Sequence, residues 1–284
     1  MIFPFIDQHR EVWPVTVMCE TLGVSTQGFY AWCSRPKSEQ EQRRDALLVE
    51  IRAVHAEVKE RYGSPRIAAE LQAKGVECCV NTVAKLMRQN DIRAKTARKF
   101  RNTTDSNHAL PVADNLLSRE FEAQGPNERW VTDITYIWTR EGWLYLAVVE
   151  DLYSRMVVGW SMSDTMTSRL VVDALEMAVQ RRLPGEGLLA HSDRGSQYAS
   201  EHYQRLLGKH GITCSMSGVA QCWDNAPMES FFASLKKELT HHEDYLTRAQ
   251  ARASIVEYIE MFYNPKRRHS SLGYLSPAEY EQAG

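Results

Sequence analysis

The first third of the chain repeats apolar residues every three or four positions over short stretches, as helices with one buried face do. Residues 15–32 divide into two such stretches. Gly23 separates them, and Ser25 can cap the second, whose Phe29 and Trp32 would face inward. A helix, a glycine turn and a second short helix form the helix-turn-helix plan, in which the second helix can lie in a DNA major groove.

A second candidate for this motif follows. Residues 38–61 have the apolar spacing of a longer helix. Beyond it, we expect Ser64 to cap a helix that has Pro65 at its first position and ends at Gly75. Asn81 is expected to cap a further helix. Because helices in this arrangement also occur in domains that never bind DNA, the pattern alone leaves both interpretations open.

Charge is divided unevenly along the chain, although the net charge is only −2. Residues 1–104 hold 17 Lys and Arg against 12 Asp and Glu, and the remainder holds 17 against 24. This favours polyanion binding by residues 1–104 and cation binding by the rest of the chain. The alternative is an accidental clustering of solvated charges. The cations expected to bind a phosphate backbone are Arg93, Lys95, Arg98, Lys99 and Arg101. We assign 1–101 to a helical DNA-binding region and 102–124 to a linker.

The pattern changes after the linker to short runs rich in β-branched and aromatic residues. Three of them predict an antiparallel meander, which a helix, a short buried strand and another helix follow. The strands are expected over 130–140, 143–154, 155–163 and 188–192, and the helices over 168–182 and 200–209. This order predicts an α/β domain over 125–240, a mixed sheet covered by helices, and it is also the order of the ribonuclease-H-like fold. Residues 241–284 are expected to form a helical and basic extension.

Three carboxylates occupy unusual places in these elements. Asp133 lies mid-strand, although aspartate is depleted in strands, and Asp193 follows the end of another strand. Asn225 is expected to cap a helix that has Glu229 near its start and Lys236 two turns later on the same face. Each acid also has an ordinary explanation: a buried ion-pair partner, a turn former and a helix-dipole partner, respectively.

Binding of divalent metal ions would explain why three carboxylates lie together. Carboxylates held together without a counter-charge raise one another's proton affinity, whereas divalent cations keep them ionised. Oxygen-only ligands favour Mg²⁺ or Mn²⁺ over zinc. Two such ions, about 3.5–4 Å apart, activate an attacking water or hydroxyl and stabilise the departing oxygen of a phosphodiester. The sequence therefore predicts a site with two ions for phosphodiester chemistry.

The spacing of these residues resembles that of DD(35)E transposases and retroviral integrases, since 35 residues separate Asp193 from Glu229 and Lys236 follows seven positions later. The stretches WVTDITYI, HSDRGSQY, DNAPMESFFASLKKE and YNPKRRHSSLGYLSPAEYE together resemble the second-frame product, orfB, of the insertion-sequence-three family of bacterial mobile elements. The resemblance implies a ribonuclease-H-like integrase core with Asp133, Asp193 and Glu229 as its triad, preceded by helix-turn-helix regions. The zinc-binding HHCC module of retroviral integrases has no counterpart here.

The resemblance also implies an activity and partners. The expected enzyme is a transposase that cuts DNA at the ends of its element and joins the freed 3′-hydroxyl to another DNA phosphate. Its DNA partners are then the terminal inverted repeats and the target DNA. The resemblance also implies a protein partner, the product of an upstream frame with a leucine zipper, joined by a frameshift fusion. The heptads that such a zipper needs are not seen in this sequence. The active form is expected to be a homo-oligomer. The alternative is a catalytically inactive DNA-binding regulator of the element, which a spoiled triad would favour, but all three acids are present.

Several other polar residues have two interpretations or a structural one. Glu150 and Asp151 lie at a strand end but match no position of the triad, so we interpret them as structural. His191 would share a strand face with Asp193, as a core histidine or as a partner of the site. Lys236 is either a solvated cation or a contact to the phosphate beside the reacting bond. A basic run that either binds DNA or is solvated is formed by Lys266, Arg267 and Arg268.

The apolar stretches, the amino terminus and the cysteines indicate the cellular compartment of the protein. No apolar stretch approaches the roughly 20 residues that cross a bilayer, and the amino terminus lacks the features of a signal peptide, so we expect a cytoplasmic protein without a membrane partner. The six cysteines show neither CxxC pairs nor zinc spacing, and we expect reduced, mostly buried thiols.

Overall fold

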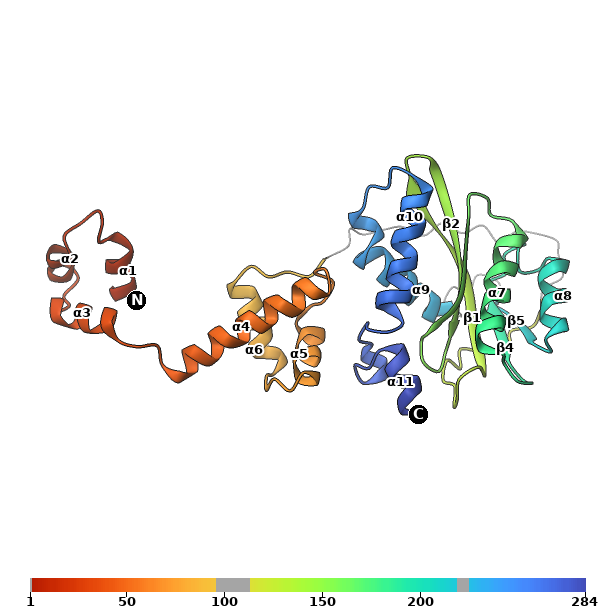
Figure 1. Ribbon diagram of the computed structural model, residues 1–284, viewed down its shortest axis with the longest axis horizontal. Coiled ribbons are helices and arrows are strands. Elements are labelled where there is room, and N and C mark those ends of the chain that lie inside the picture. Colours follow the sequence, from red (N-terminus) through yellow and green to blue (C-terminus); the bar gives the residue numbers. More distant parts are fainter. Residues whose placement is uncertain (1, 96–112, 219–224) are drawn as a thin grey trace.

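Three helices at the amino terminus form a small unit in the computed structural model, which describes residues 2–95, 113–218 and 225–284 (Figure 1). They are α1 (Ile2–His9), α2 (Val15–Thr21) and α3 (Thr26–Ser34). Gly23 makes the turn between α2 and α3 with a φ of 69°. Ser25 caps α3 as predicted, since its hydroxyl accepts a hydrogen bond from the Gly28 amide at 2.9 Å. The helix α1 adds to the predicted pair, and its Ile6 packs with Phe29 in the core of the unit.

A second helical unit consists of α4 (Glu39–Glu57), α5 (Ser64–Ala73) and α6 (Val80–Gln89). Ser38 begins α4 through a capping box. Two predicted caps are wrong, because Ser64 and Asn81 lie inside α5 and α6, whose N-caps are Gly63 and Cys79. Both helices begin slightly earlier than their side-chain signals indicate, so the predicted helix-turn-helix pair is present with shifted boundaries.

The α/β domain contains one sheet in which long antiparallel strands join short parallel ones. Its strands are β1 (Arg129–Thr139), β2 (Gly142–Asp151), β3 (Val157–Ser163), β4 (Leu189–Ser192) and β5 (Thr213–Met216). Their order across the sheet is β3-β2-β1-β4-β5. β1 and β2 pair antiparallel along their whole length, as do β2 and β3 over most of theirs, while β4 lies parallel to both β1 and β5.

Helices cover both faces of this sheet (Figure 1). α7 (Ser168–Arg182) and α8 (Glu201–Lys209) pack on the face that carries Trp130 and Ala147. The opposite face carries Val131 and Leu146 and packs on α9 (Ala226–Glu238), α10 (Arg248–Val256) and the π-helix η3 (Glu257–Tyr263). Short helices at Thr240–His242, Ser270–Leu272 and Pro277–Ala283 (α11) complete the chain. Successive strand residues thus enter opposite cores, as the alternation of a pleated strand requires.

Close packing of α7 on β3 requires glycine at position 159. A Cβ atom there would lie 2.2 Å from the carbonyl oxygen of Ala174 and 2.8 Å from the Cβ of Ala178. Any side chain would therefore push α7 away from the sheet.

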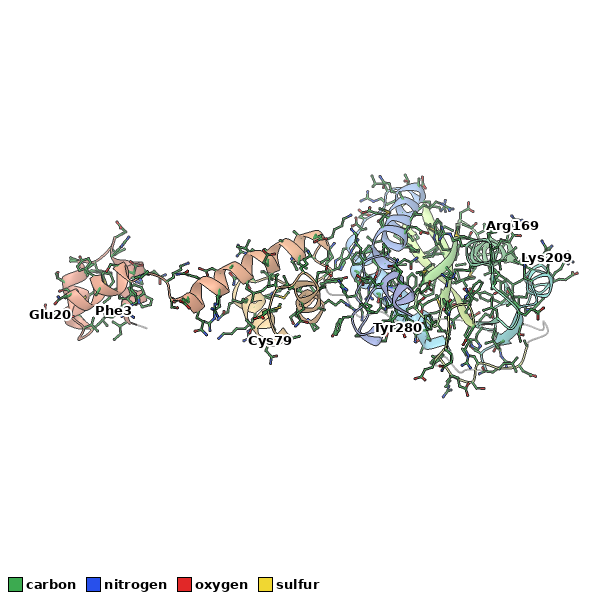
Figure 2. The ribbon with its side chains drawn as sticks, turned by 60° about the horizontal axis from the view of Figure 1, so that its bottom comes forward. Phe3, Glu20, Cys79, Arg169, Lys209 and Tyr280 are labelled. Atoms are coloured by element: carbon green, nitrogen blue, oxygen red, sulfur yellow. The ribbon has the colours of Figure 1, made fainter. Side chains whose placement is uncertain are left out.

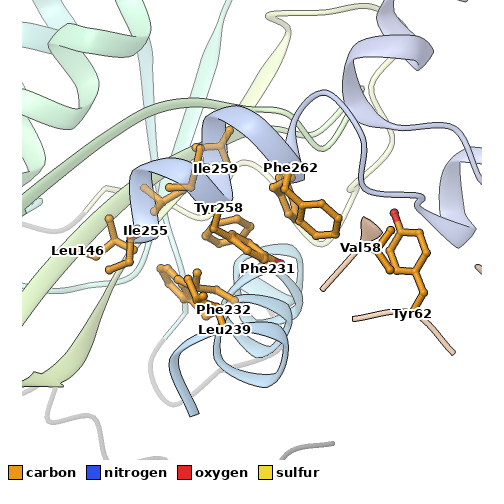
Figure 3. Packing of buried hydrophobic residues seen from close by; sticks show 14 of the residues in the cluster. Val58, Tyr62, Leu146, Phe231, Phe232, Leu239, Ile255, Tyr258, Ile259 and Phe262 are labelled. Carbon is orange, nitrogen blue, oxygen red and sulfur yellow. The ribbon is translucent and has the colours of Figure 1, made fainter. Parts of the chain in front are cut away.

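The second helical unit packs against the carboxyl-terminal part of the chain. Figure 3 shows Val58 and Tyr62 beside Phe262, within one core that also holds residues of α9 and α10. The Tyr62 hydroxyl donates a hydrogen bond to the Lys266 carbonyl at 3.2 Å and accepts one from the Arg268 amide at 2.9 Å. Segments about 200 residues apart in sequence are therefore joined by buried polar and apolar contacts.

These elements confirm the predicted fold class, an α/β domain of ribonuclease-H-like order preceded by a helical region. The antiparallel meander is confirmed, and α7 has the bounds predicted from sequence. The strand β5 was not predicted, because Thr213–Met216 lacks the continuous apolar run that marks β4, which is equally short. The described part of the predicted linker packs on this strand, since the Ser215 hydroxyl accepts hydrogen bonds from the amides of Leu116 and Leu117.

The five described cysteines are free thiols, as expected, but only Cys19 is buried, and Cys79 is exposed on the second helical unit (Figure 2). None of the helices in the described part of the chain is long and apolar enough to span a membrane.

Candidate active site

The pairing of β1 with β4 brings Asp133 and Asp193 together. The last register pair of these parallel strands is Thr132 with Ser192. The two aspartates are the next residue on each strand, and neighbouring strands lie about 4.8 Å apart. β4 ends there, while β1 continues for seven residues without β4 beside it. Both acids consequently lie where the sheet opens.

The third acid reaches this place through the start of α9. Asn225 precedes that helix, but its side chain does not cap it as predicted. Its amide nitrogen instead donates a hydrogen bond to the carbonyl of Thr132 at 3.2 Å. This contact fastens the beginning of α9 to the open end of the sheet, and Glu229 lies in the first turn of the helix.

The charges of Asp193 and Glu229 act on Asp133. Asp133 is half-buried, and its pKa is raised well above the ordinary value, first by burial and next by the charge of Asp193, with a further contribution from Glu229. The Ile134 amide donates a hydrogen bond to Asp133 Oδ1 at 2.7 Å, and this opposes the rise in pKa only in part. Burial also raises the pKa of Glu229.

Asp193 also shapes the turn that follows β4. Its Oδ1 accepts a hydrogen bond from the Gly195 amide at 2.9 Å. A Cβ at Gly195 would lie 3.0 Å from that same oxygen and 2.9 Å from Gln197 Oε1, so a larger residue there would displace these two side chains. The turn-forming role considered from the sequence is therefore real.

Lys236 extends from α9 toward the acids. Its ammonium lies 5.4 Å from the centre of the Tyr136 ring. Burial lowers the pKa of this lysine, and the charge of Asp133 opposes that shift. Because Asp133 and Lys236 influence each other's pKa, the lysine belongs to the electrostatic surroundings of the acids rather than to a separate solvated face.

The donor chemistry of the site fits Mg²⁺ or Mn²⁺, because three carboxylates supply oxygen ligands only and their repulsion is unbalanced without a cation. Within the described ranges, however, no three acidic, histidine or cysteine side chains lie close enough together to hold a metal ion as they stand.

Three other polar residues near the site have structural roles. His191 is fully buried, with Nδ1 2.8 Å from the Ser215 hydroxyl and Nε2 3.1 Å from the Ser217 hydroxyl, so it is a core histidine. Glu150 is buried beside Arg155, with 3.6 Å between the charged atoms, and burial raises its pKa to about 8. Asp151 accepts hydrogen bonds from two main-chain amides.

The first basic run predicted to bind DNA is only partly described by the structure. Arg93 is exposed and pairs with Asp91 at 3.3 Å, and Lys95 is half-buried. Arg98, Lys99 and Arg101 lie outside the described residues. A further set of polar and basic side chains, which the sequence-based prediction did not name, lies on the exposed face of α6: Asn81, Lys85, Arg88 and Gln89. Their spacing along a helix was the signal that identifies such a face.

The other basic run departs from expectation. Lys266 is exposed, but Arg267 and Arg268 are buried. The Arg267 guanidinium pairs with Glu238 at 2.6 Å, and Arg268 pairs with Glu70 at 2.8 Å. As they lie here, neither guanidinium can reach a DNA phosphate, because each is enclosed by its carboxylate partners. Their role is to join α9 and α5 to the carboxyl-terminal segment.

Comparison with protein families agrees with this architecture. The family described as "Integrase core domain" matches residues 123–222, and a second family with the same description matches 229–283. The family described as "HTH-like domain" matches residues 42–100. Fold and families together define a DNA-transposing enzyme that has an integrase core and a helix-turn-helix-like domain.

Full-length relatives narrow this class. The chain is 46% identical over 283 residues to "Transposase InsF for insertion sequence IS3A" of Escherichia coli (strain K12), which covers 99% of this chain and 98% of that protein. It is 44% identical over 265 residues to "Insertion element IS600 uncharacterized 31 kDa protein" of Shigella sonnei, and this match covers 93% of this chain and 97% of that protein. The chain belongs to the transposases of the insertion-sequence IS3 family.

Solved structures with similar folds are more distant. The catalytic core domain of HTLV-2 integrase in complex with magnesium has 18% identity and a TM-score of 0.43, covering 56% of this chain and 99% of that one. The simian T-cell lymphotropic virus intasome has 14% identity and a TM-score of 0.49, and the match covers 82% of this chain and 74% of that one.

The burial of Arg267 leads to a prediction about stability. Arg267→Ala should lower the free energy of unfolding by about 3–5 kcal/mol, because it leaves the buried carboxylate of Glu238 without its partner. The exposed neighbour provides the control, since Lys266→Ala should change that free energy by no more than about 0.5 kcal/mol. Urea unfolding of both variants measures the difference. A large loss of DNA affinity in a stably folded Arg267→Ala variant would contradict this assignment.

Proposed function

We propose that this transposase cuts DNA at the ends of its element and transfers the freed 3′-hydroxyl to a target phosphate, with Asp133, Asp193 and Glu229 as its catalytic acids. The observation that supports this most strongly is the meeting of the middle of β1, the end of β4 and the start of α9, where burial first and then the charges of the other two acids raise the pKa of Asp133. Such crowding of like charges costs stability, and a site keeps it for a function.

Under this proposal the three carboxylates bind divalent cations, two Mg²⁺ or Mn²⁺ ions. When bound, such ions stabilise negative charge on the attacking and departing oxygens of a phosphodiester. The chain's own residues then have simple tasks. The carboxylates stay ionised as ligands, the amides of Ile134 and Gly195 orient two of them, and Lys236 binds the phosphate beside the reacting bond.

We also propose that α6 is the DNA-contacting helix of the second helical unit. Its exposed face carries Lys85 and Arg88 together with two amide side chains, which suit phosphates and base edges respectively. The open groove between α4 and α6 is lined by Arg43 and Arg44 from the opposite side. Arg93, Lys95 and the cations at 98, 99 and 101 would extend this contact along the backbone.

The active assembly is proposed to be a homo-oligomer that also contains the upstream-frame product as a frameshift fusion. Joining two element ends requires two catalytic domains held together. The longest helix in the described residues, α4, buries Ile51 and Val54 within its own unit, so it is not available as a zipper. We infer that the assembly works in the bacterial cytoplasm, where its DNA substrate lies.

The first prediction of the proposal concerns the acids. Asp133→Asn, Asp193→Asn and Glu229→Gln should each lower Mg²⁺-dependent cleavage of an end-bearing DNA by roughly a thousandfold, because the amide keeps the shape but loses the charge that holds the ions. Single-turnover cleavage assays measure this loss. Matched controls are Asp173→Asn on α7 and Glu201→Gln on α8, which should cleave at the wild-type rate.

Two results would count against the assignment. Near wild-type cleavage by one of the three variants removes that residue from the site. Tight, end-specific binding by the wild-type chain without cleavage under any divalent cation favours instead the regulator that binds DNA but does not cut it.

The second prediction concerns α6. The double variant Lys85→Ala/Arg88→Ala should bind duplex DNA more weakly, and the slope of log affinity against log salt concentration should fall by about 0.9 for each phosphate that is no longer neutralised. Fluorescence anisotropy at several salt concentrations measures both. Arg205→Ala on α8 removes an exposed cation elsewhere and should leave the slope unchanged. An unchanged slope in the double variant would show that α6 does not contact the backbone.

The third prediction concerns the fusion. With Mg²⁺ and a DNA that carries both element ends, the chain fused to its upstream segment should join paired ends efficiently, and the unfused chain should not, because the fused zipper holds two catalytic domains together. Gel analysis of joined products measures this. A fusion that also carries Asp133→Asn controls for joining by contaminants. Efficient paired-end joining by the unfused chain would show that the core assembles without the upstream product.

A further inference from the structure

An aromatic strip, in which two rings are exposed and one is half-buried, lies on the β1–β2 hairpin beyond the end of β4. It consists of Tyr136, Trp138 and Trp143. The side chains of Trp138 and Trp143 face each other across the hairpin, with ring centres 4.9 Å apart, and Tyr136 lies 5.0 Å from Trp143 in an edge-to-face contact. Trp138 is 59% exposed and Trp143 is 42% exposed. Two large apolar rings side by side in solvent are unusual on a domain with a full core.

The hairpin does not need these rings to pack on the domain. Its other face carries Ile137 and Leu144, which are buried in the core that contains Ala251 and Ile255 of α10. Alternation along the strands places the aromatic strip on the opposite side, away from that core. The tryptophans stabilise each other, but their outward faces remain uncovered.

The hairpin is also held in position. The Arg140 amide donates a hydrogen bond to the Tyr245 carbonyl at 3.0 Å, and its guanidinium pairs with Asp244. From the start of α10, Arg248 donates to the carbonyl of Trp143 at 3.0 Å through Nε and to the carboxylate of Glu141 at 2.8 Å through its amide. These contacts hold the exposed rings on a fixed support, which lowers the entropy cost of stacking a ligand on them.

The strip begins at the acids. Lys236 lies with its ammonium 5.4 Å from the Tyr136 ring, and the same lysine interacts electrostatically with Asp133. Trp138 is five residues beyond Asp133 on β1, so alternation turns the two side chains to opposite faces of the strand. The strip therefore approaches the acids at its Tyr136 end, where the Lys236 ammonium lies between the ring and Asp133 beside the part of β1 that β4 leaves unpaired.

We propose that Tyr136, Trp138 and Trp143 stack the unpaired bases of the DNA strand that leaves the active site. This inference rests on the proposed function, which locates strand cleavage at Asp133, Asp193 and Glu229. The faces of bases within a duplex are already stacked, so exposed aromatic faces favour unpaired nucleotides over paired ones. The strip holds the end of the element open beside the acids and keeps the cut strand from pairing again.

The test compares two DNA ligands and two substitutions in the full chain. The ligands are an element end that is fully paired and the same end with its terminal nucleotides unpaired. Anisotropy without divalent cations measures affinity, and the wild-type chain should prefer the unpaired end. The variant Trp138→Leu/Trp143→Leu should lose roughly tenfold in affinity for the unpaired end only, with the salt dependence unchanged, because stacking is abolished and no charge is removed.

The matched variant is Trp138→Phe/Trp143→Phe, which keeps aromatic faces and should retain most of the preference. Met261→Ala, at an exposed apolar position on η3, controls for loss of exposed apolar surface and should bind like the wild type. Thermal unfolding verifies that each variant is folded. If the leucine variant does not fold, the single substitution Trp138→Ala at the more exposed ring replaces it in the comparison.

Three results would overturn the inference: a wild-type chain without preference for the unpaired end, a folded leucine variant that keeps the preference, or leucine substitutions that change the oligomeric state and not the DNA preference. The last would show that the strip contacts a second copy of the chain. Because binding is measured without cleavage, a preference for unpaired ends in a chain that cuts no DNA would refute only the proposed function.

Discussion

The short parallel pairing between β1 and β4 is the contact on which the candidate site depends. It ends at Thr132 and Ser192, so the next residues, two aspartates, share the end of the sheet. The carbonyl of Thr132 then accepts a hydrogen bond from Asn225, which places the start of α9 and Glu229 at the same point. A longer β4 would have paired further along β1 and closed the opening.

The helix that brings Glu229 is fixed at both ends. At its start it is held by Asn225, and at its end the buried carboxylate of Glu238 pairs with Arg267 and accepts a hydrogen bond from the Tyr258 hydroxyl at 2.8 Å. The carboxyl-terminal segment is thereby part of the catalytic domain, although it follows α9 in sequence. Rigid support of this kind offsets the repulsion among the acids, which favours moving them apart.

The agreement between sequence-based prediction and structure differs between kinds of element. The meander and α7 were predictable because long runs show their period, two for strands and 3.6 for helices. β5 was not, because it lacks the apolar run that marks the equally short β4. The caps of α5 and α6 were not predictable either, since the start of a helix depends on how the chain enters it. The basic run at 266–268 misled for a related reason: charge in a sequence does not tell whether a side chain has a buried partner.

The sequence by itself determined the family and the order of the longer elements, and it pointed to three candidate acids, because spacing, periodicity and residue type are properties of the chain alone. Only the tertiary structure decided what lies beside what. The register that joins Asp133 to Asp193, the contact from Asn225 to Thr132, the burial of Arg267 and the exposure of Trp138 all depend on segments far apart in sequence. Such contacts are set by packing and hydrogen bonding across the whole domain, which no local pattern of residues encodes.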